Sequence, residues 1–154
     1  MSAFACVSSL VLLLSGCASF SGKDGPPVGI GDEVRRSERL ALESQTLARL
    51  SAMERSLNDF IRAERRIPEK LEELVPKYLA EIPETALDVR AHKDTSEVRY
   101  YPPELIVDGQ INGAALKDTG GWGYAHNARQ VIVFVDCTHK MSDGKLWYRA
   151  RGVY

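Results

Sequence analysis

The sequence predicts an α+β fold, in which one long N-terminal amphipathic helix packs on a small antiparallel meander sheet. Apolar residues recur at spacings of three and four through residues 32–66, which is the period of a helix with one buried face. Short strand-like segments, separated by glycine and proline turns, follow from residue 96 onward. Because the helix and the strands occupy separate parts of the chain, the α+β class is favoured over an alternating α/β fold.

The predicted helix is about 50 Å long at 1.5 Å per residue. Asp32 is its expected N-cap, and Pro68 is expected to end it. Its first turns, through Ser37, carry few apolar residues and are expected to protrude from the domain. One apolar stripe is predicted to face the sheet, and its members are Leu40, Leu47, Leu50, Met53, Leu57, Phe60 and Ile61.

The rest of the chain is predicted to hold a second short helix, a turn and the sheet. Pro68 suits the first turn of that helix, which puts Leu71 and Leu74 on one side. A short helical turn between Pro76 and Pro83 is expected to follow. The expected strands are residues 96–101, 105–107, 122–124, 130–137 and 146–149, with the third and fourth forming a hairpin.

The N-terminus carries an apolar run at residues 4–14, about 11 residues against the roughly 20 needed to span a bilayer. It ends in Leu14-Ser15-Gly16-Cys17, which resembles the lipobox of a bacterial lipoprotein. The resemblance implies that the Cys17 thiol receives a diacylglyceryl group and that the chain is cut before Cys17 and acylated there. Ala18 after the lipidated residue implies delivery to the outer membrane, facing the periplasm.

These observations divide the chain into three parts. Residues 1–16 are the expected lipoprotein signal peptide, and residues 17–31 are the lipidated cysteine and a flexible tether rich in glycine and proline. Residues 32–154 are the expected globular domain, which is long enough for one core. The chain is thus expected to meet the membrane through the lipid on Cys17.

Three stretches of the globular domain resemble the type IV pilin-like fold, and type II secretion pseudopilins in particular. Residues 57–68 end in an Ile-Pro step, and residues 71–83 contain paired leucines, a Tyr-Leu step and a closing Ile-Pro. Gly120-Gly121-Trp122-Gly123-Tyr124 then opens the predicted hairpin. The resemblance implies a binding or assembly component of a secretion or pilus-type system, with a secretin, a pseudopilin or another envelope protein as partner.

The chain departs from pilins at its N-terminus. Pilins enter the membrane through an apolar half-helix, whereas a lipobox and a tether stand in that place here, so a filament core is not expected. Pseudopilins of the major type also carry an acidic calcium loop near the C-terminus. Its nearest counterparts are Asp136, Ser142 and Asp143, too few for the six to eight oxygens that Ca²⁺ prefers.

Composition narrows the function further. The chain has 20 basic and 21 acidic residues and a formal net charge of −1, so no nucleic-acid partner is expected. No glycine-rich loop precedes a helix in the manner of a phosphate site, and no cofactor is predicted. The leading interpretation is therefore a non-enzymatic binding protein.

The alternative function is an envelope enzyme or metal-binding protein that uses Cys137 and His139. On a strand these two side chains project to the same face, where they could supply two zinc ligands. Asp136, Cys137 and His139 are the metal candidates, while His92 and His126 fall in predicted loops without ligand spacing. The opposing interpretation, and the favoured one, is a buried thiol that packs as a small apolar group.

Four aromatic residues of the C-terminal half leave two interpretations open. They either form an exposed face for a glycan or a partner, or bridge the small sheet and its covering helix. Bridging is the more common arrangement and is expected here. The four residues are Trp122, Tyr124, Trp147 and Tyr148.

Overall fold

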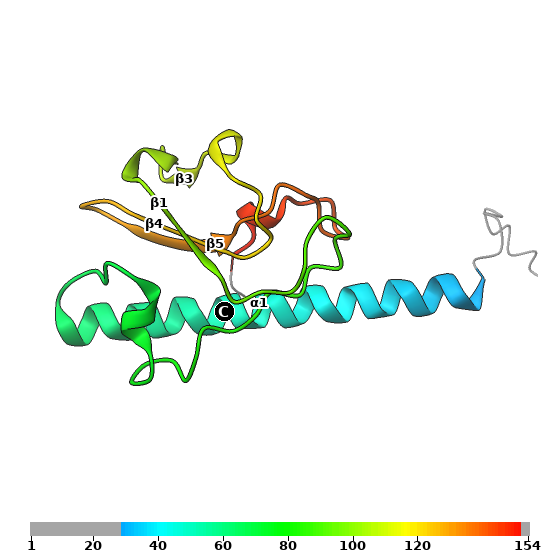
Figure 1. Cartoon of the computed structure of the whole chain (residues 1–154), viewed down its shortest axis with the longest axis horizontal. Helices are drawn as coiled ribbons and strands as arrows, with labels where there is room; N and C mark the ends of the chain where they lie inside the picture. Colours follow the sequence, from blue (N-terminus) through cyan, green and yellow to red (C-terminus); the bar gives the residue numbers. More distant parts are fainter. Residues whose placement is uncertain (1–28, 152–154) are drawn as a thin grey trace, which may run out of the picture.

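The protein, described here from a computed structural model, packs one long helix along a small sheet (Figure 1). The structure describes residues 29–151. The predicted signal peptide, the lipobox-like sequence and most of the predicted tether lie outside the described residues, as do residues 152–154. Within residues 29–151, no helix has the length and apolar character needed to cross a membrane.

The long helix, α1 (Ile30–Glu64), begins and ends slightly earlier than the sequence predicts. Gly29, and not Asp32, is its N-cap. Its end is set by Arg65, which adopts the left-handed conformation (φ 56°) and donates its N–H to the Ile61 carbonyl at 3.0 Å. The helix therefore ends four residues before Pro68, which was expected to end it.

The apolar stripe of α1 faces the sheet over its C-terminal two thirds. Leu50, Met53, Leu57 and Phe60 are buried, as predicted. Leu40 is 44% exposed, so its assignment to the buried stripe is wrong. The reason is visible in Figure 1: the N-terminal part of α1 extends beyond the sheet, and every residue from 29 to 41 is exposed.

The main sheet has three strands in the order β1-β4-β5, namely β1 (Val98–Tyr101), β4 (Trp122–His126) and β5 (Val131–Val135). The last two form the predicted antiparallel hairpin. The first strand, however, runs parallel to β4, so the sheet is mixed and not antiparallel throughout. Residues 102–121 carry the chain back across the sheet, which allows β1 and β4 to start side by side.

That crossover contains a small two-stranded ribbon, β2 (Ile106–Val107) paired with β3 (Gln110–Ile111). Single 3₁₀ turns flank the ribbon at Pro103–Leu105 and Gly113–Ala115. The first strand of the ribbon lies within the predicted strand at residues 105–107. The α+β class, with a long helix on a small sheet, is confirmed.

Two predicted elements are shorter or different in kind. The second helix is one 3₁₀ turn, Leu71–Leu74, because Pro76 disfavours helical geometry at Val75. The predicted last strand is a 3₁₀ turn, Trp147–Arg149, preceded by one bridge between Lys140 and Leu146. Residues 147 and 148 still donate their N–H groups to the carbonyls of residues 139 and 137, which fixes this segment beside the end of β5.

The core lies between α1 and the sheet. Alternate side chains of β5 point to opposite faces, so Val133 and Val135 pack with the helix cluster, whereas Phe134 packs on the other side. Phe134 covers Gly123, where an added Cβ would lie 2.2 Å from the ring. All four aromatic residues in question are buried, so they form no exposed face. Trp122, Tyr124 and Trp147 pack in the cluster that includes the helix, as the bridging interpretation predicts, whereas Tyr148 packs with Phe134 on the other side of the sheet.

Candidate functional site

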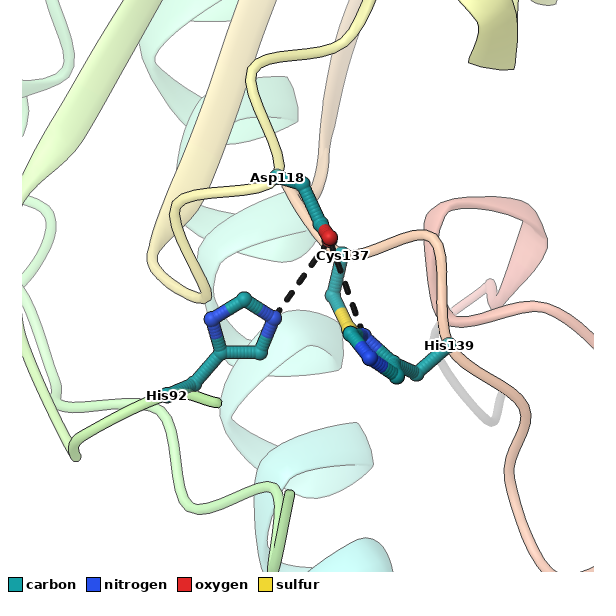
Figure 2. A group of neighbouring side chains, drawn as sticks. All are labelled: His92, Asp118, Cys137 and His139. Carbon is teal, nitrogen blue, oxygen red and sulfur yellow. Dashed lines mark hydrogen bonds and ion pairs between the residues drawn. The ribbon is translucent and has the colours of Figure 1, made fainter. Parts of the chain in front are cut away.

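Three loops at one end of the sheet bring four side chains together (Figure 2). His92 comes from the loop before β1, Asp118 from the loop before β4, and Cys137 and His139 from the segment after β5. One donor atom of each, two imidazole nitrogens, a carboxylate oxygen and the thiol sulfur, lies within 4.8 Å of the other three. Among residues 29–151, this is a group whose composition and spacing suit a metal ion.

Strand pairing explains why two of these loops meet. The antiparallel pairing of β4 with β5 places the start of β4 beside the end of β5. Two further backbone bonds continue the ladder, since Asp136 donates its N–H to Gly121 and Gly120 donates its N–H to Asp136, both at 2.8 Å. The segment before β4 is thereby held against the segment that carries Cys137 and His139.

Asp118 is oriented by its backbone and by a neighbouring amide. It adopts the left-handed conformation (φ 57°), and its Oδ1 accepts the N–H of Thr138 at 2.7 Å. Burial works to raise the pKa of this carboxyl, but the bonds from Thr138 and the nearby His92 and His139 outweigh burial and hold the pKa below its usual value. Asp118 is therefore negatively charged at neutral pH.

His92 is almost completely buried, with 7% of its side chain exposed. Its Nε2 makes no hydrogen bond and lies 3.4 Å from Oδ1 of Asp118. The imidazole of His139 meets it edge-on, with ring centroids 5.1 Å apart. A buried ring nitrogen that makes no hydrogen bond is costly, and this one points toward Asp118 and the centre of the group (Figure 2).

Cys137 is fully buried, which confirms the burial expected from its place after an apolar strand. Its Sγ lies 3.5 Å from Nδ1 of His139, and that same nitrogen lies 3.8 Å from Oδ1 of Asp118. Burial raises the pKa of the Cys137 thiol to about 12. In the metal-free protein the thiol thus keeps its proton at neutral pH.

The arrangement of Asp118, Cys137 and His139 differs from that of a catalytic Cys-His-Asp triad. In a Cys-His-Asp relay the carboxylate binds one imidazole nitrogen and the sulfur faces the other. Here both Asp118 and Cys137 face Nδ1 of His139. A catalytic thiol also needs access and a lowered pKa, whereas Cys137 is buried and its pKa is raised. The four donors suit shared coordination of a cation better than a proton relay.

The structure brings Cys137 and His139 together, as the sequence suggested, but it does not bring Asp136 to them. The buried Asp136 carboxylate instead accepts the Tyr101 hydroxyl at 2.9 Å and the Thr119 hydroxyl at 2.7 Å, together with backbone amides of residues 118 and 119. Its role is to hold the loop that carries Asp118. Asp136 therefore supports the site without belonging to it.

His92 and Asp118 were missed by sequence reasoning. No local spacing links either of them to Cys137, because a crossover and a strand pairing bring the three loops together. His126 ends β4, packs against the Tyr124 ring and is not part of the group.

The counterparts of the pseudopilin calcium residues have separate partners. Ser142 donates its hydroxyl to the Glu43 carboxylate at 2.9 Å, and the Lys145 ammonium lies 2.9 Å from the Asp143 carboxylate. The Asp136 carboxylate is occupied by the Tyr101 hydroxyl and by donors of the loop before β4.

No protein-family model matches this chain, and no curated protein and no solved structure shows significant similarity to it. Function is therefore inferred from the residues and their geometry.

Proposed function

We propose that this protein is a lipid-anchored envelope protein that binds another envelope protein as an assembly component of a secretion or pilus-type system. Lipidation at Cys17 would hold it on the outer membrane, facing the periplasm. The lipobox order and the three pilin-like stretches support this role. The observation that carries it is the shape of the domain, a long helix on a small sheet, in which the end of α1 nearest the lipobox projects beyond the sheet (Figure 1).

Crosslinking in intact cells tests this role, with Cys17→Ala as the unanchored control. We expect the wild-type protein to recover a secretin, a pseudopilin or another envelope protein, and the control to lose it. Recovery of no specific partner by the wild-type protein would contradict the assembly role. Equal recovery by both proteins would contradict the need for the anchor.

The anchor itself has a direct test. We expect the wild-type chain to incorporate radiolabelled palmitate and to fractionate with the outer membrane, and Cys17→Ala to do neither. A wild-type chain without label would contradict lipidation, whatever partner it binds.

A second candidate function, metal binding, is favoured by one observation. His92 and Asp118 join Cys137 and His139, and one donor atom of each residue lies within 4.8 Å of the other three. The two functions are independent, since a domain can hold a metal ion whether or not it is anchored. Metal analysis of the purified full chain tests this candidate, and we expect about one bound ion per chain.

A further inference from the structure

We infer that His92, Asp118, Cys137 and His139 form a closed tetrahedral zinc site that fastens three loops at one end of the sheet. This inference rests on metal binding as a function and adds the identity of the ion, its coordination and its role. Figure 2 shows the four side chains converging from separate segments of the chain.

The donor set selects the ion. It offers one sulfur, two imidazole nitrogens and one carboxylate oxygen. Ca²⁺ and Mg²⁺ prefer shells made of oxygen, so a thiol and two imidazoles disfavour them. Zn²⁺ accepts sulfur, nitrogen and oxygen in one shell and is four-coordinate in most structural sites. Cu²⁺ and Ni²⁺ prefer planar or tetragonal shells, whereas Zn²⁺ prefers a tetrahedral one.

The distances between donors agree with a tetrahedron. Zinc lies roughly 2.0–2.3 Å from its ligands, which places neighbouring ligand atoms of a tetrahedron about 3.3–3.8 Å apart. Nε2 of His92 is 3.4 Å from Oδ1 of Asp118, and Sγ of Cys137 is 3.5 Å from Nδ1 of His139. The same nitrogen of His139 is 3.8 Å from Oδ1 of Asp118. Two of the six edges thus already have the expected length. The edge from Nδ1 of His139 to Oδ1 of Asp118 is longer than the roughly 3.3 Å of a nitrogen–oxygen edge, and no donor pair exceeds 4.8 Å.

The buried nitrogen of His92 also supports a bound ion, because its contact with Asp118 at 3.4 Å leaves it without a hydrogen bond. Nε2 has no hydrogen-bond partner, although its side chain is more than nine-tenths buried. Such an atom costs free energy unless something satisfies it. A zinc ion bound between the four donors would accept the lone pair of this nitrogen.

The charges also balance. Zinc binding replaces the proton on Cys137 by the metal, so that one Zn–S bond forms and one proton is released to solvent. The thiolate and the Asp118 carboxylate then carry two negative charges, and the two imidazoles are neutral. Together they offset the two positive charges of the ion, which suits a partly buried site in which Cys137 is fully buried.

Four protein ligands leave no open position for water or substrate, which is the pattern of a structural zinc site. The ion would tie the loop before β1 to the loop before β4 and to the segment after β5. His139 is 43% exposed and gives the ion a route from solvent. Asp118 is already oriented by the N–H of Thr138, so little rearrangement is needed.

Metal titration with spectroscopy tests the inference. The full chain is purified from membranes in detergent, without a polyhistidine tag, stripped with a chelator, and titrated with Co²⁺ and then Zn²⁺. We expect one Co²⁺ per chain, the intense visible absorption of tetrahedral Co²⁺ and a near-ultraviolet band from thiolate charge transfer. Added Zn²⁺ should abolish both.

Variants assign the ligands. Cys137→Ser should remove the charge-transfer band, and His92→Ala and His139→Ala should each weaken zinc binding by at least about tenfold. His126→Ala is the matched control, since this histidine lies outside the group and should leave the spectrum and the affinity unchanged. Circular dichroism checks that each variant is folded. If the Cys137 variant fails to fold, the wild-type spectrum together with His139→Ala decides the question.

The possible failures are distinct. Binding with a pale octahedral spectrum and no thiolate band would overturn the tetrahedral site while leaving metal binding intact. An unchanged thiolate band in folded Cys137→Ser would overturn the ligand assignment. No bound metal at micromolar free zinc would overturn both the inference and the metal-binding function, but would leave the anchored assembly role untouched.

Discussion

Gly120 lies against the ring of His92, so closely that a Cβ at position 120 would be 2.5 Å from Cγ of the imidazole. The glycine also adopts φ +79°, a conformation that side chains rarely allow. Backbone shape and side-chain space at this one residue therefore determine where His92 can sit.

We expect Gly120→Ala to destabilise the domain by about 1–3 kcal/mol, because it combines left-handed strain with a clash. It should also displace His92 and weaken zinc binding. Urea denaturation measures the first effect and competition with a coloured chelator the second. Gly144→Ala is a matched control, since Gly144 has φ +85° but no atom within 4 Å of the added Cβ. Equal zinc affinities in the two variants would contradict the part assigned to Gly120.

Asp136 should be a strong stability determinant. Its buried carboxylate accepts two hydroxyl and two amide hydrogen bonds, and Asp136→Asn would turn one acceptor oxygen into a donor facing other donors. We expect a loss of about 2–4 kcal/mol in the free energy of unfolding. The exposed Asp143→Asn should cost less than about 0.5 kcal/mol. A similar small cost for Asp136→Asn in urea melts would show that this network matters little.

Truncation of the buried stripe of α1 tests the packing of helix on sheet. We expect Leu57→Ala or Phe60→Ala to lower the free energy of unfolding by about 2–5 kcal/mol. Leu40→Ala offers the comparison, because this leucine is 44% exposed and its truncation should cost no more than about 0.5 kcal/mol. Comparable losses at positions 40 and 57 would be incompatible with the observed burial.

Zinc removal should lower thermal stability. A ligand at 100 times its dissociation constant stabilises the folded state by about 2.7 kcal/mol, which corresponds to a Tm shift of roughly 10 °C for a domain of this size. We therefore expect a chelator to lower the Tm of the wild-type chain measured by calorimetry and to leave the Tm of Cys137→Ser unchanged. An identical chelator effect in both would place the bound metal elsewhere.

The fold could be predicted where the determinants are local. Helical periodicity identified α1, and strand-like segments around residues 125–129 identified the β4–β5 hairpin. The parallel pairing of β1 with β4 could not be predicted in this way, because it depends on the path of residues 102–121. The exposure of Leu40 likewise depends on where the sheet ends, a property that the helix sequence does not contain.

The candidate site likewise combines residues that local sequence predicts with residues that only the tertiary fold brings together. Cys137 and His139 were predicted as neighbours because they are two positions apart on one strand-like segment, which puts both side chains on the same face. His92 and Asp118 reach them only through the crossover and the strand pairing. Asp136 is adjacent to Cys137 in sequence, but its side chain turns to the hydroxyls of Tyr101 and Thr119. Sequence adjacency therefore favoured the wrong carboxylate.

The projecting end of α1 gives the protein a rigid lever between Gly29 and the body of the domain. The first contacts between the helix and the segment before β1 are made by Arg39 and Thr46. Arg39 donates a hydrogen bond to the Asp88 carboxylate at 3.0 Å, and the Thr46 hydroxyl exchanges hydrogen bonds with the backbone of Ala86 at 2.9 Å. From Gly29 to Arg39 the helix rises roughly 15 Å. A force or rotation applied at Gly29 would therefore be transmitted along the helix to the sheet, so the domain would turn together with the projecting end of α1.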